Sequence, residues 1–234
     1  GSSSRIKLSP KGIVLIISPW NYPILLTLSP LVGALAGGNC VMIKPSEYTP
    51  HTAAVMEQLV AETFPEAEVK LVQGEAETAK ALLKLPFHHI FFTGSPRVGK
   101  LVMKAAADHL ASLTLELGGK SPVIVDSTAN LHKSAQRIAW SKFLNAGQTC
   151  VAPDYILAHE SIARELGEKI LEYWRNFTRE EPDDRLHYSG LVHEQHLERK
   201  EELLAELPPE TEVVRLQRDR SEERRVGKEC ATGC

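Results

Sequence analysis

The stretch from Gly12 to Lys44, GIVLIISPWNYPILLTLSPLVGALAGGNCVMIK, decides the fold. Its first seven residues, GIVLIIS, form an apolar run rich in β-branched side chains, which predicts a buried strand. Residues 23–36 predict a helix, because two glycines, which commonly end helices, follow this largely apolar segment. Residues 40–44 predict the next strand. Strand, helix and strand in so short a span are typical of a parallel sheet with helical crossovers.

The same alternation continues as far as residue 144. Further strands are expected at residues 69–72, 89–92, 112–117 and 123–125, and further helices at residues 50–63, 76–84, 96–107 and 131–144. This pattern predicts a parallel sheet that is covered by helices on both faces. Beyond Arg179 the composition becomes charged, and one more helix is expected at residues 194–207.

Composition and charge are those of an ordinary soluble protein. The 234 residues are 43% hydrophobic and 24% charged, with a net charge of −3, which gives no indication of nucleic acid or a membrane surface as a partner. No apolar run reaches the roughly 18–20 residues that a membrane span needs. No signal peptide opens the sequence, so a cytoplasmic location is expected.

Cysteines and histidines give no metal or disulfide pattern. The four cysteines have no zinc-ligand spacing and follow no secretory signal, so neither a metal site nor disulfides are expected. Cys40 lies in an apolar run and is expected to be a small core side chain. His88 and His89 stand beside a strand without a metal partner in sequence, and are expected to be structural.

Two segments carry the groups that covalent thiol chemistry needs. Cys150 ends the run NAGQTC, residues 145–150, in a loop that can expose its sulfur and offer backbone N–H groups to it. Glu116 belongs to LELGGK, residues 115–120, where the two glycines favour close approach of another group. A thiolate can attack a carbonyl, and a carboxylate can activate the water that later releases the acyl group. The strand pattern alone also allows Glu116 simply to face solvent.

Asn21 is a third candidate. It lies in SPWNYP, residues 18–23, a loop that two prolines stiffen. An amide that is held in place beforehand can donate a hydrogen bond to an oxyanion. An asparagine in such a loop can equally serve only to make a turn or a cap.

Taken together, and in their order along the chain (residues 18–23, 115–120 and 145–150), the three segments resemble the aldehyde dehydrogenase superfamily. The resemblance is greatest to its class 3 and fatty-aldehyde branch. The resemblance covers residues 5–215. It implies an α/β protein with a Rossmann-like doubly wound parallel sheet as cofactor domain over residues 1–117. The first part of an α/β catalytic domain would follow over residues 118–215. It also implies that Cys150 is the nucleophile, Glu116 the base for deacylation, and Asn21 an oxyanion donor together with the backbone N–H of Cys150.

The resemblance further implies an NAD or NADP site. Lys44 and Glu47 would contact the adenosine ribose, where a carboxylate favours NAD over a 2′-phosphate, although class 3 members often accept both cofactors. The loop GSPRVGK, residues 94–100, would face the pyrophosphate. The remaining implied cofactor-binding residues are Trp20, Gly94, Ser95, Val98, Gly99, Leu117 and Gly118.

The glycine-rich loop also fits most of a nucleoside triphosphatase pattern, G-x-x-x-x-G-K-[ST]. The last position is Leu101, which has no hydroxyl to offer a magnesium ion. Pro96 removes one backbone N–H from the phosphate cradle. These two residues disfavour a triphosphatase.

Two other functions stay open. One is an acylating or acyl-phosphate-reducing dehydrogenase of the same superfamily, which Glu116 disfavours; the other is a non-catalytic scaffold protein. A small-molecule aldehyde is the expected substrate, and the resemblance implies a homodimeric parent protein. Compared with complete members of the family, the chain is expected to be truncated at both ends, and this fragment is expected to be inactive by itself. Residues 220–234 are expected to be a non-native tail translated from a DNA sequencing adapter; the alternative is a natural, charged and solvated tail.

Overall fold

The computed structural model describes residues 3–7, 9–177, 189–209, 211 and 213. By its internal contacts the chain divides into two units, Gly1–Gly118 and Gly119–Cys234. The assignment of cofactor and catalytic domains with a boundary after residue 117 stays a prediction. The expected tail, residues 220–234, lies outside the described residues.

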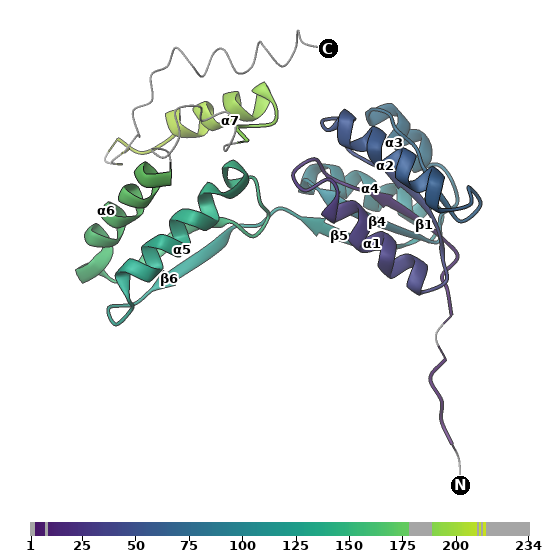
Figure 1. The fold of residues 1–234 in the computed structure, drawn as a ribbon, viewed down its shortest axis with the longest axis horizontal. Helices are drawn as coiled ribbons and strands as arrows, with labels where there is room; N and C mark the ends of the chain where they lie inside the picture. The colour runs from purple at the N-terminus through teal and green to yellow at the C-terminus, as the bar shows by residue number, and fades with distance from the viewer. Residues whose placement is uncertain (1–2, 8, 178–188, 210, 212, 214–234) are drawn as a thin grey trace. The chain divides into compact units, whose positions relative to one another are not determined.

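The first unit is a five-stranded parallel sheet with helices on both faces (Figure 1). Its strands are β1 (Ile13–Ile17), β2 (Cys40–Lys44), β3 (Val69–Leu71), β4 (His89–Gly94) and β5 (Ser112–Leu117). Its helices are α1 (Leu25–Ala36), α2 (Pro50–Thr63), α3 (Ala76–Leu82) and α4 (Pro96–Asp108). The strand order is β3-β2-β1-β4-β5, with every neighbouring pair parallel. The expected doubly wound α/β class is confirmed.

Strand β1 shows why both faces of the sheet are covered. Because successive side chains of a strand point to opposite faces, a run without polar residues needs apolar partners on each side. Ile16 packs with Leu31 of α1, and Leu15 packs in a separate cluster with Val102 of α4. Ile16 and Leu15 are both 0% exposed. Complete burial of one such side chain stabilises the folded state by about 1.5–3 kcal/mol.

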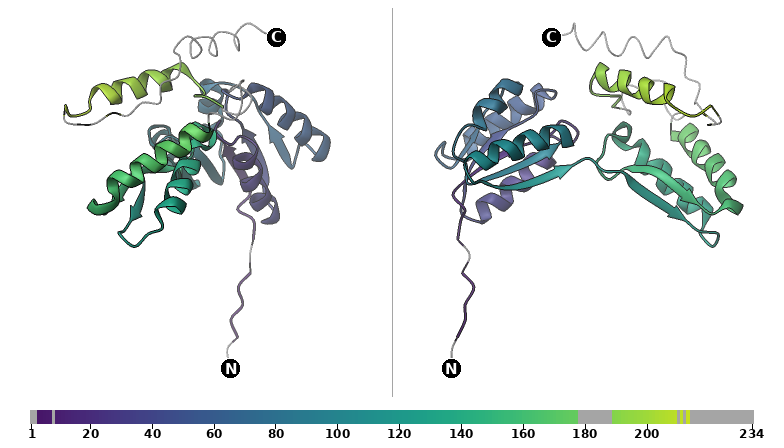
Figure 2. Two further views of the ribbon diagram at one scale, coloured as in Figure 1. Left: turned by 60° about the vertical axis from the view of Figure 1, so that its left-hand side comes forward. Right: turned by 180° about the vertical axis from the view of Figure 1, so that it is seen from behind.

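The second unit pairs two parallel strands with two packed helices. The strands are β6 (Ser121–Val125) and β7 (Pro153–Ala158), and α5 (Leu131–Phe143) lies along β6 in both Figure 1 and Figure 2. Helix α6 (Glu160–Phe177) packs beside α5, where Ile138 and Leu166 are buried in one core. A short helix, η1 (Leu144–Gly147), follows α5, and α7 (Glu194–Ala205) follows later.

Several differences from the sequence-based expectations have physical causes. Helix α5 ends at Phe143 because Asn145 and Ala146 take positive φ values of 51° and 55°, which no α-helix accommodates. Strand β7 and helix α6 were not expected, and both belong to the second unit. The expectation that Cys40 is a core side chain is wrong, since this first residue of β2 is exposed. Among the described residues, no helix combines the length and apolar character of a membrane span.

Candidate active site

The carboxyl ends of four neighbouring strands hold most of the expected site residues of the first unit. The strands β2, β1, β4 and β5 are parallel neighbours, so their carboxyl ends lie at one edge of the sheet. This is the edge where open α/β sheets bind ligands. Asn21 follows β1, Lys44 ends β2, Gly94 ends β4, and Leu117 ends β5.

The loop that carries Trp20 and Asn21 is tied down by buried hydroxyl groups. The hydroxyl of Thr27, a fully buried residue of α1, donates to the carbonyl oxygen of Pro23 at 2.5 Å and lies 2.6 Å from the hydroxyl oxygen of Ser18. The Oδ1 atom of Asn21 accepts a hydrogen bond from the backbone N–H of Tyr22 at 3.1 Å. These contacts join the end of β1 to the first turn of α1 and restrict the orientation of the asparagine amide.

Lys44 and Glu47 form the most buried ion pair of this edge. Lys44 is 3% exposed, and its Nζ atom lies 2.7 Å from Oε2 of Glu47. Burial raises the pKa of Glu47, but the hydrogen bond and charge of Lys44, with a backbone hydrogen bond, outweigh it and lower the pKa below its ordinary value. A buried ammonium needs such a partner, and the carboxylate of Glu47 provides it. Lys44 is therefore not a solvated surface charge.

An open pocket of about 190 Å³ lies beside this ion pair. Whole ligands usually occupy pockets of about 300–1,000 Å³, so this one suits a single part of a larger molecule. Its polar side chains come from the loops after β2 and β3. The residues that line it are Pro45, Ser46, Glu47, Pro50, Ala53, Gln73, Gly74 and Glu75. Of these residues, only Glu47 was expected from the sequence to bind the cofactor. The others could have been found from their position in loops that follow parallel strands, where α/β sheets bind ligands.

The loop between β4 and α4 combines a capped helix start with two tightly packed glycines. The Oγ atom of Ser95 accepts a hydrogen bond from the backbone N–H of Val98 at 3.3 Å, which caps α4. A Cβ atom on Gly94 would lie 2.6 Å from the ring of Phe92. Gly99 is buried, and a Cβ atom there would lie 3.0 Å from Leu117, so Gly99 lets α4 approach β5. The described contacts of Gly99 are thus packing contacts.

Glu116 occupies the end of an edge strand. It pairs in register with Thr93 on β4, and β5 is the last strand of the described sheet. Its side chain is exposed, which is the solvent-facing orientation that the strand pattern allowed. An exposed carboxylate at the ligand-binding edge is accessible to water, as a deacylating base must be. Leu117 packs into the core, and Gly118 ends the unit.

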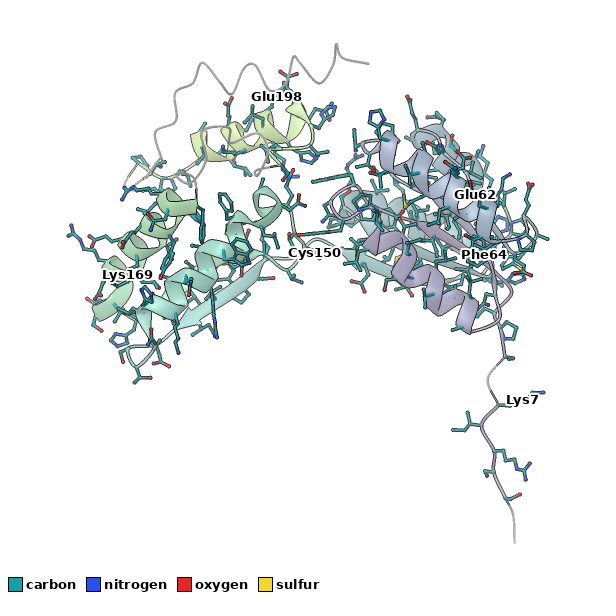
Figure 3. The ribbon with its side chains drawn as sticks, in the orientation of Figure 1. Lys7, Glu62, Phe64, Cys150, Lys169 and Glu198 are labelled. Atoms are coloured by element: carbon teal, nitrogen blue, oxygen red, sulfur yellow. The ribbon has the colours of Figure 1, made fainter. Side chains whose placement is uncertain are left out.

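Cys150, labelled in Figure 3, lies in the second unit with an exposed thiol. The chain reaches it through three consecutive residues with positive φ, Asn145, Ala146 and Gly147, at 51°, 55° and 73°. Such a backbone costs an alanine roughly 1–3 kcal/mol and persists only when neighbouring contacts hold it. A tight turn of this kind directs the following residues away from the end of α5.

Gln148 provides the contacts that hold this loop. Its Nε2 atom donates to the carbonyl oxygens of Asn145 and Gly190, at 3.0 and 2.9 Å, and its Oε1 atom accepts from the backbone N–H of Val192 at 3.1 Å. One side chain thus connects the loop of Cys150 with a segment more than forty residues later. No sequence signal indicates this role, because two of the three partners of Gln148 are backbone groups of a distant segment.

Gly119 contacts the same loop from the segment just before β6. A Cβ atom on this residue would lie 2.7 Å from the carbonyl oxygen of Cys150, closer than real Cβ contacts. Lys120, the next residue, forms an ion pair with Asp154 at 3.2 Å. A side chain on Gly119 would therefore require the backbone of Cys150 or the segment before β6 to shift.

The paired histidines make structural hydrogen bonds. His88 accepts from the backbone N–H of Ile13 at 3.0 Å, and His89 bonds Ser112 and Thr114 at 2.8 and 3.2 Å. Burial, with a smaller contribution from the charge of Lys11, lowers the pKa of His89. Within the described ranges, no three histidine, cysteine or carboxylate side chains are grouped as a metal ion would need.

The sheet order and the ligand-binding edge define a doubly wound α/β protein of the kind that binds nucleotide cofactors. Residues 1–227 match the family model described as the aldehyde dehydrogenase family. The chain belongs to this family, whose members are NAD(P)-dependent oxidoreductases. The match ends inside the segment expected to be a non-native tail.

Named relatives agree with this assignment. The chain is 47% identical over 203 residues to 4,4′-diaponeurosporen-aldehyde dehydrogenase of Staphylococcus aureus, covering 87% of this chain and 44% of the relative. It is 45% identical over 194 residues to the mouse dimeric NADP-preferring aldehyde dehydrogenase, covering 83% and 43%. A structure of Staphylococcus aureus AldH in a substrate-bound state matches with a TM-score of 0.79 and 47% identity, covering 84% and 43%.

A more distant structure shows the same fold. The NAD-dependent aldehyde dehydrogenase of Sinorhizobium meliloti matches with a TM-score of 0.75 and 32% identity, covering 84% of this chain and 40% of that one. The chain thus spans less than half the length of the relatives it matches.

Proposed function

We propose that the protein containing this chain oxidises an aldehyde to a carboxylic acid with NAD or NADP as acceptor. The observation that carries the proposal is the exposed thiol of Cys150, held on a strained loop by Gln148 in a chain of the aldehyde dehydrogenase family. An exposed thiol on a tightly held loop suits a nucleophile better than a structural cysteine.

The first half of the reaction uses Cys150 and Asn21. The thiolate sulfur attacks the aldehyde carbon, the C=O π bond breaks, and the oxygen becomes an oxyanion in a thiohemiacetal. The amide of Asn21 and the backbone N–H of Cys150 donate hydrogen bonds to this oxygen. The buried hydroxyl groups behind Asn21 support this role, because donors aimed in advance need no reorganisation during the reaction.

The cofactor half of the site is assigned to the sheet edge of the first unit. Lys44 and Glu47 would hold the ribose beside the pocket, and the capped start of α4 at Ser95 would face the pyrophosphate. A dinucleotide held at this edge would supply the acceptor for the hydride that leaves the thiohemiacetal carbon. Departure of the hydride leaves a thioester on Cys150.

The second half of the reaction uses Glu116. Its carboxylate takes a proton from water, the hydroxide oxygen attacks the thioester carbon, and the carbon–sulfur bond breaks to release the acid and the thiolate. The exposed position at the end of β5 supports access of water to this carboxylate. A homodimer and a cytoplasmic location remain predictions beside this activity.

The test is the substitution Cys150→Ser in the complete protein, with Cys40→Ser as matched control. Both thiols are exposed, but Cys40 starts β2, away from the ligand-binding edge. Loss of the nucleophile should reduce aldehyde-dependent NADH or NADPH formation at least about a thousandfold. The dinucleotide affinity of Cys150→Ser and the turnover of the control Cys40→Ser should stay near the values of the unmodified protein.

Two results would contradict the proposal. If Cys150→Ser kept more than about a tenth of the turnover, Cys150 would not be the nucleophile. If the unmodified protein formed acyl-coenzyme A or reduced acyl phosphates in place of releasing a carboxylic acid, it would be an acylating or reducing member of the superfamily.

A further inference from the structure

The pocket beside β2 and β3 is acidic. Glu47 and Glu75 line it, and none of the described lining residues is lysine, arginine or histidine. The ammonium of Lys44 lies behind Glu47 at 2.7 Å, so its charge is already neutralised by that carboxylate. The formal charges of these three groups leave the pocket with one negative charge.

The lysines nearest in sequence to the loop after β3 are also paired. Lys70 lies 2.9 Å from a carboxylate oxygen of Glu66, and Lys80 lies 2.5 Å from one of Glu77. Both pairs are exposed and weak, but each places a carboxylate beside the cation. Neither cation therefore adds an unbalanced positive charge next to the pocket.

The two helices that begin at the pocket offer little to an anion. Helix α2 starts with Pro50, which has no backbone N–H to donate. Helix α3 is only seven residues long, and the carboxylate of Glu75 directly precedes it. The usual attraction of a phosphate to a helix N-terminus is thus weakened at both places.

The loop that carries Glu75 is held in position. Gln73 donates from Nε2 to Oε2 of Glu57 on α2 at 2.6 Å, which ties the loop to that helix. Gly74 has a φ of 145°, and a Cβ atom there would lie 2.1 Å from the hydroxyl oxygen of Thr78. The backbone on both sides of Gly74 is thus held, because the carbonyl oxygen of Glu75 also accepts hydrogen bonds from the backbone N–H groups of Thr78 and Ala79, and Glu75 therefore leaves the chain from a fixed position beside the pocket.

Cofactor preference is not uniform among the relatives of this chain. The mouse relative at 45% identity is named NADP-preferring, and the Sinorhizobium meliloti structure at 32% identity is named NAD-dependent. Local residues must therefore decide the preference in each protein. NADP differs from NAD by a phosphate ester on the adenosine ribose, and such an ester carries nearly two negative charges at neutral pH.

We infer that Glu75 is a specificity-determining residue that, together with Glu47, excludes a phosphorylated ribose and makes this protein select NAD. The inference rests on the proposed function, in which the adenosine half of the dinucleotide lies in this pocket. Ribose hydroxyls can donate hydrogen bonds to both carboxylates. A phosphate in their place would meet two like charges and no unpaired cation.

The experiment measures dissociation constants by titration calorimetry with the complete protein. The probes are NAD, NADP, adenosine 5′-monophosphate and adenosine 2′,5′-bisphosphate. The variant is Glu75→Gln, and the matched control is Glu77→Gln, an exposed carboxylate of α3 that does not line the pocket. The unmodified protein should bind NAD at least about tenfold more tightly than NADP, and the monophosphate more tightly than the bisphosphate.

The substitution should act in opposite directions on ligands with and without a phosphate on the ribose 2′-oxygen. Glu75→Gln should tighten binding of NADP and of the bisphosphate about three- to tenfold, since one like charge is removed. It should weaken NAD and the monophosphate by no more than about threefold, because the glutamine amide oxygen still accepts a hydrogen bond from a ribose hydroxyl. Glu77→Gln should change none of the four affinities.

Equal affinity of the unmodified protein for NAD and NADP would overturn the inference. An equal change in the dissociation constants of NAD and NADP in Glu75→Gln would also overturn it. Binding of none of the four probes would contradict the proposed dinucleotide function as well, so the two failures are distinguishable.

Discussion

The close contact between Gly119 and Cys150 makes Gly119→Ala an informative perturbation. The added Cβ atom would lie 2.7 Å from the carbonyl oxygen of Cys150, whereas ordinary contacts begin at 3.4 Å. The cysteine backbone must therefore move by about 0.7 Å, or β6 must shift by the same amount. Either movement changes the position of the nucleophile.

The size of the effect differs between stability and activity. Overpacking costs typically about 1–3 kcal/mol, and the lower end applies here because both residues are exposed, so the added atom displaces no core side chain. A displacement of about 1 Å in a reacting group can reduce the rate about a hundredfold. We therefore expect a loss of about 1 kcal/mol in stability and a ten- to hundredfold loss in kcat/KM.

The assay compares three measurements on the complete protein: thermal unfolding, aldehyde-dependent NADH formation, and the rate of alkylation of the Cys150 thiol. Gly167→Ala is the matched control, since it lies on α6 of the same unit and its added Cβ would meet nothing within 4 Å. This control should leave the activity unchanged and stabilise the helix slightly, by up to about 1 kcal/mol.

Unchanged activity and alkylation in Gly119→Ala would refute the reasoning, because the contact would then not position the cysteine. A large loss of stability with full activity per folded molecule would assign Gly119 to folding alone.

Three further predictions concern other parts of the chain. Glu116→Gln in the complete protein should give one equivalent of NADH in a rapid burst and then stall, as seen by stopped-flow absorbance; loss of the burst would instead make Glu116 necessary for activating the thiol. Because the pKa of His89 is lowered in the folded state, its contribution to stability is full above its ordinary pKa of 6.5 and is lost as the pH falls through its folded pKa. Chemical unfolding at about pH 7.5 and about pH 5.5 should show a smaller pH dependence in His89→Gln than in the unmodified protein, and equal slopes would contradict this. The 234-residue chain expressed by itself should form no NADH and should self-associate through side chains such as Ile124, which is 78% exposed; a monomeric, active chain in light-scattering and activity measurements would overturn that expectation.

The alternation of strands and helices in the first unit could be predicted from the sequence alone. The boundaries of β2, β5 and α2 agree with those expected, because short apolar runs and the proline at the start of α2 are local signals. The apolar character of β1 on both sides was enough to predict a sheet covered on both faces. The motifs around Cys150 and Glu116 were likewise sufficient to indicate the family.

Other features depend on contacts between distant segments. Helix α6 has charged residues on one face and an apolar face that includes Leu166 and Ile170, and these apolar side chains become a core only when α5 packs against them. Burial of Lys44 follows from its place inside the sheet and from the partner three residues later. The roles of Gln148 and Gly119 depend on backbone groups that the fold brings to them from elsewhere in the chain. Local sequence thus determined the elements and the reactive groups, whereas tertiary packing decided which groups are buried, paired and held in place, because those properties depend on neighbours that are remote in sequence.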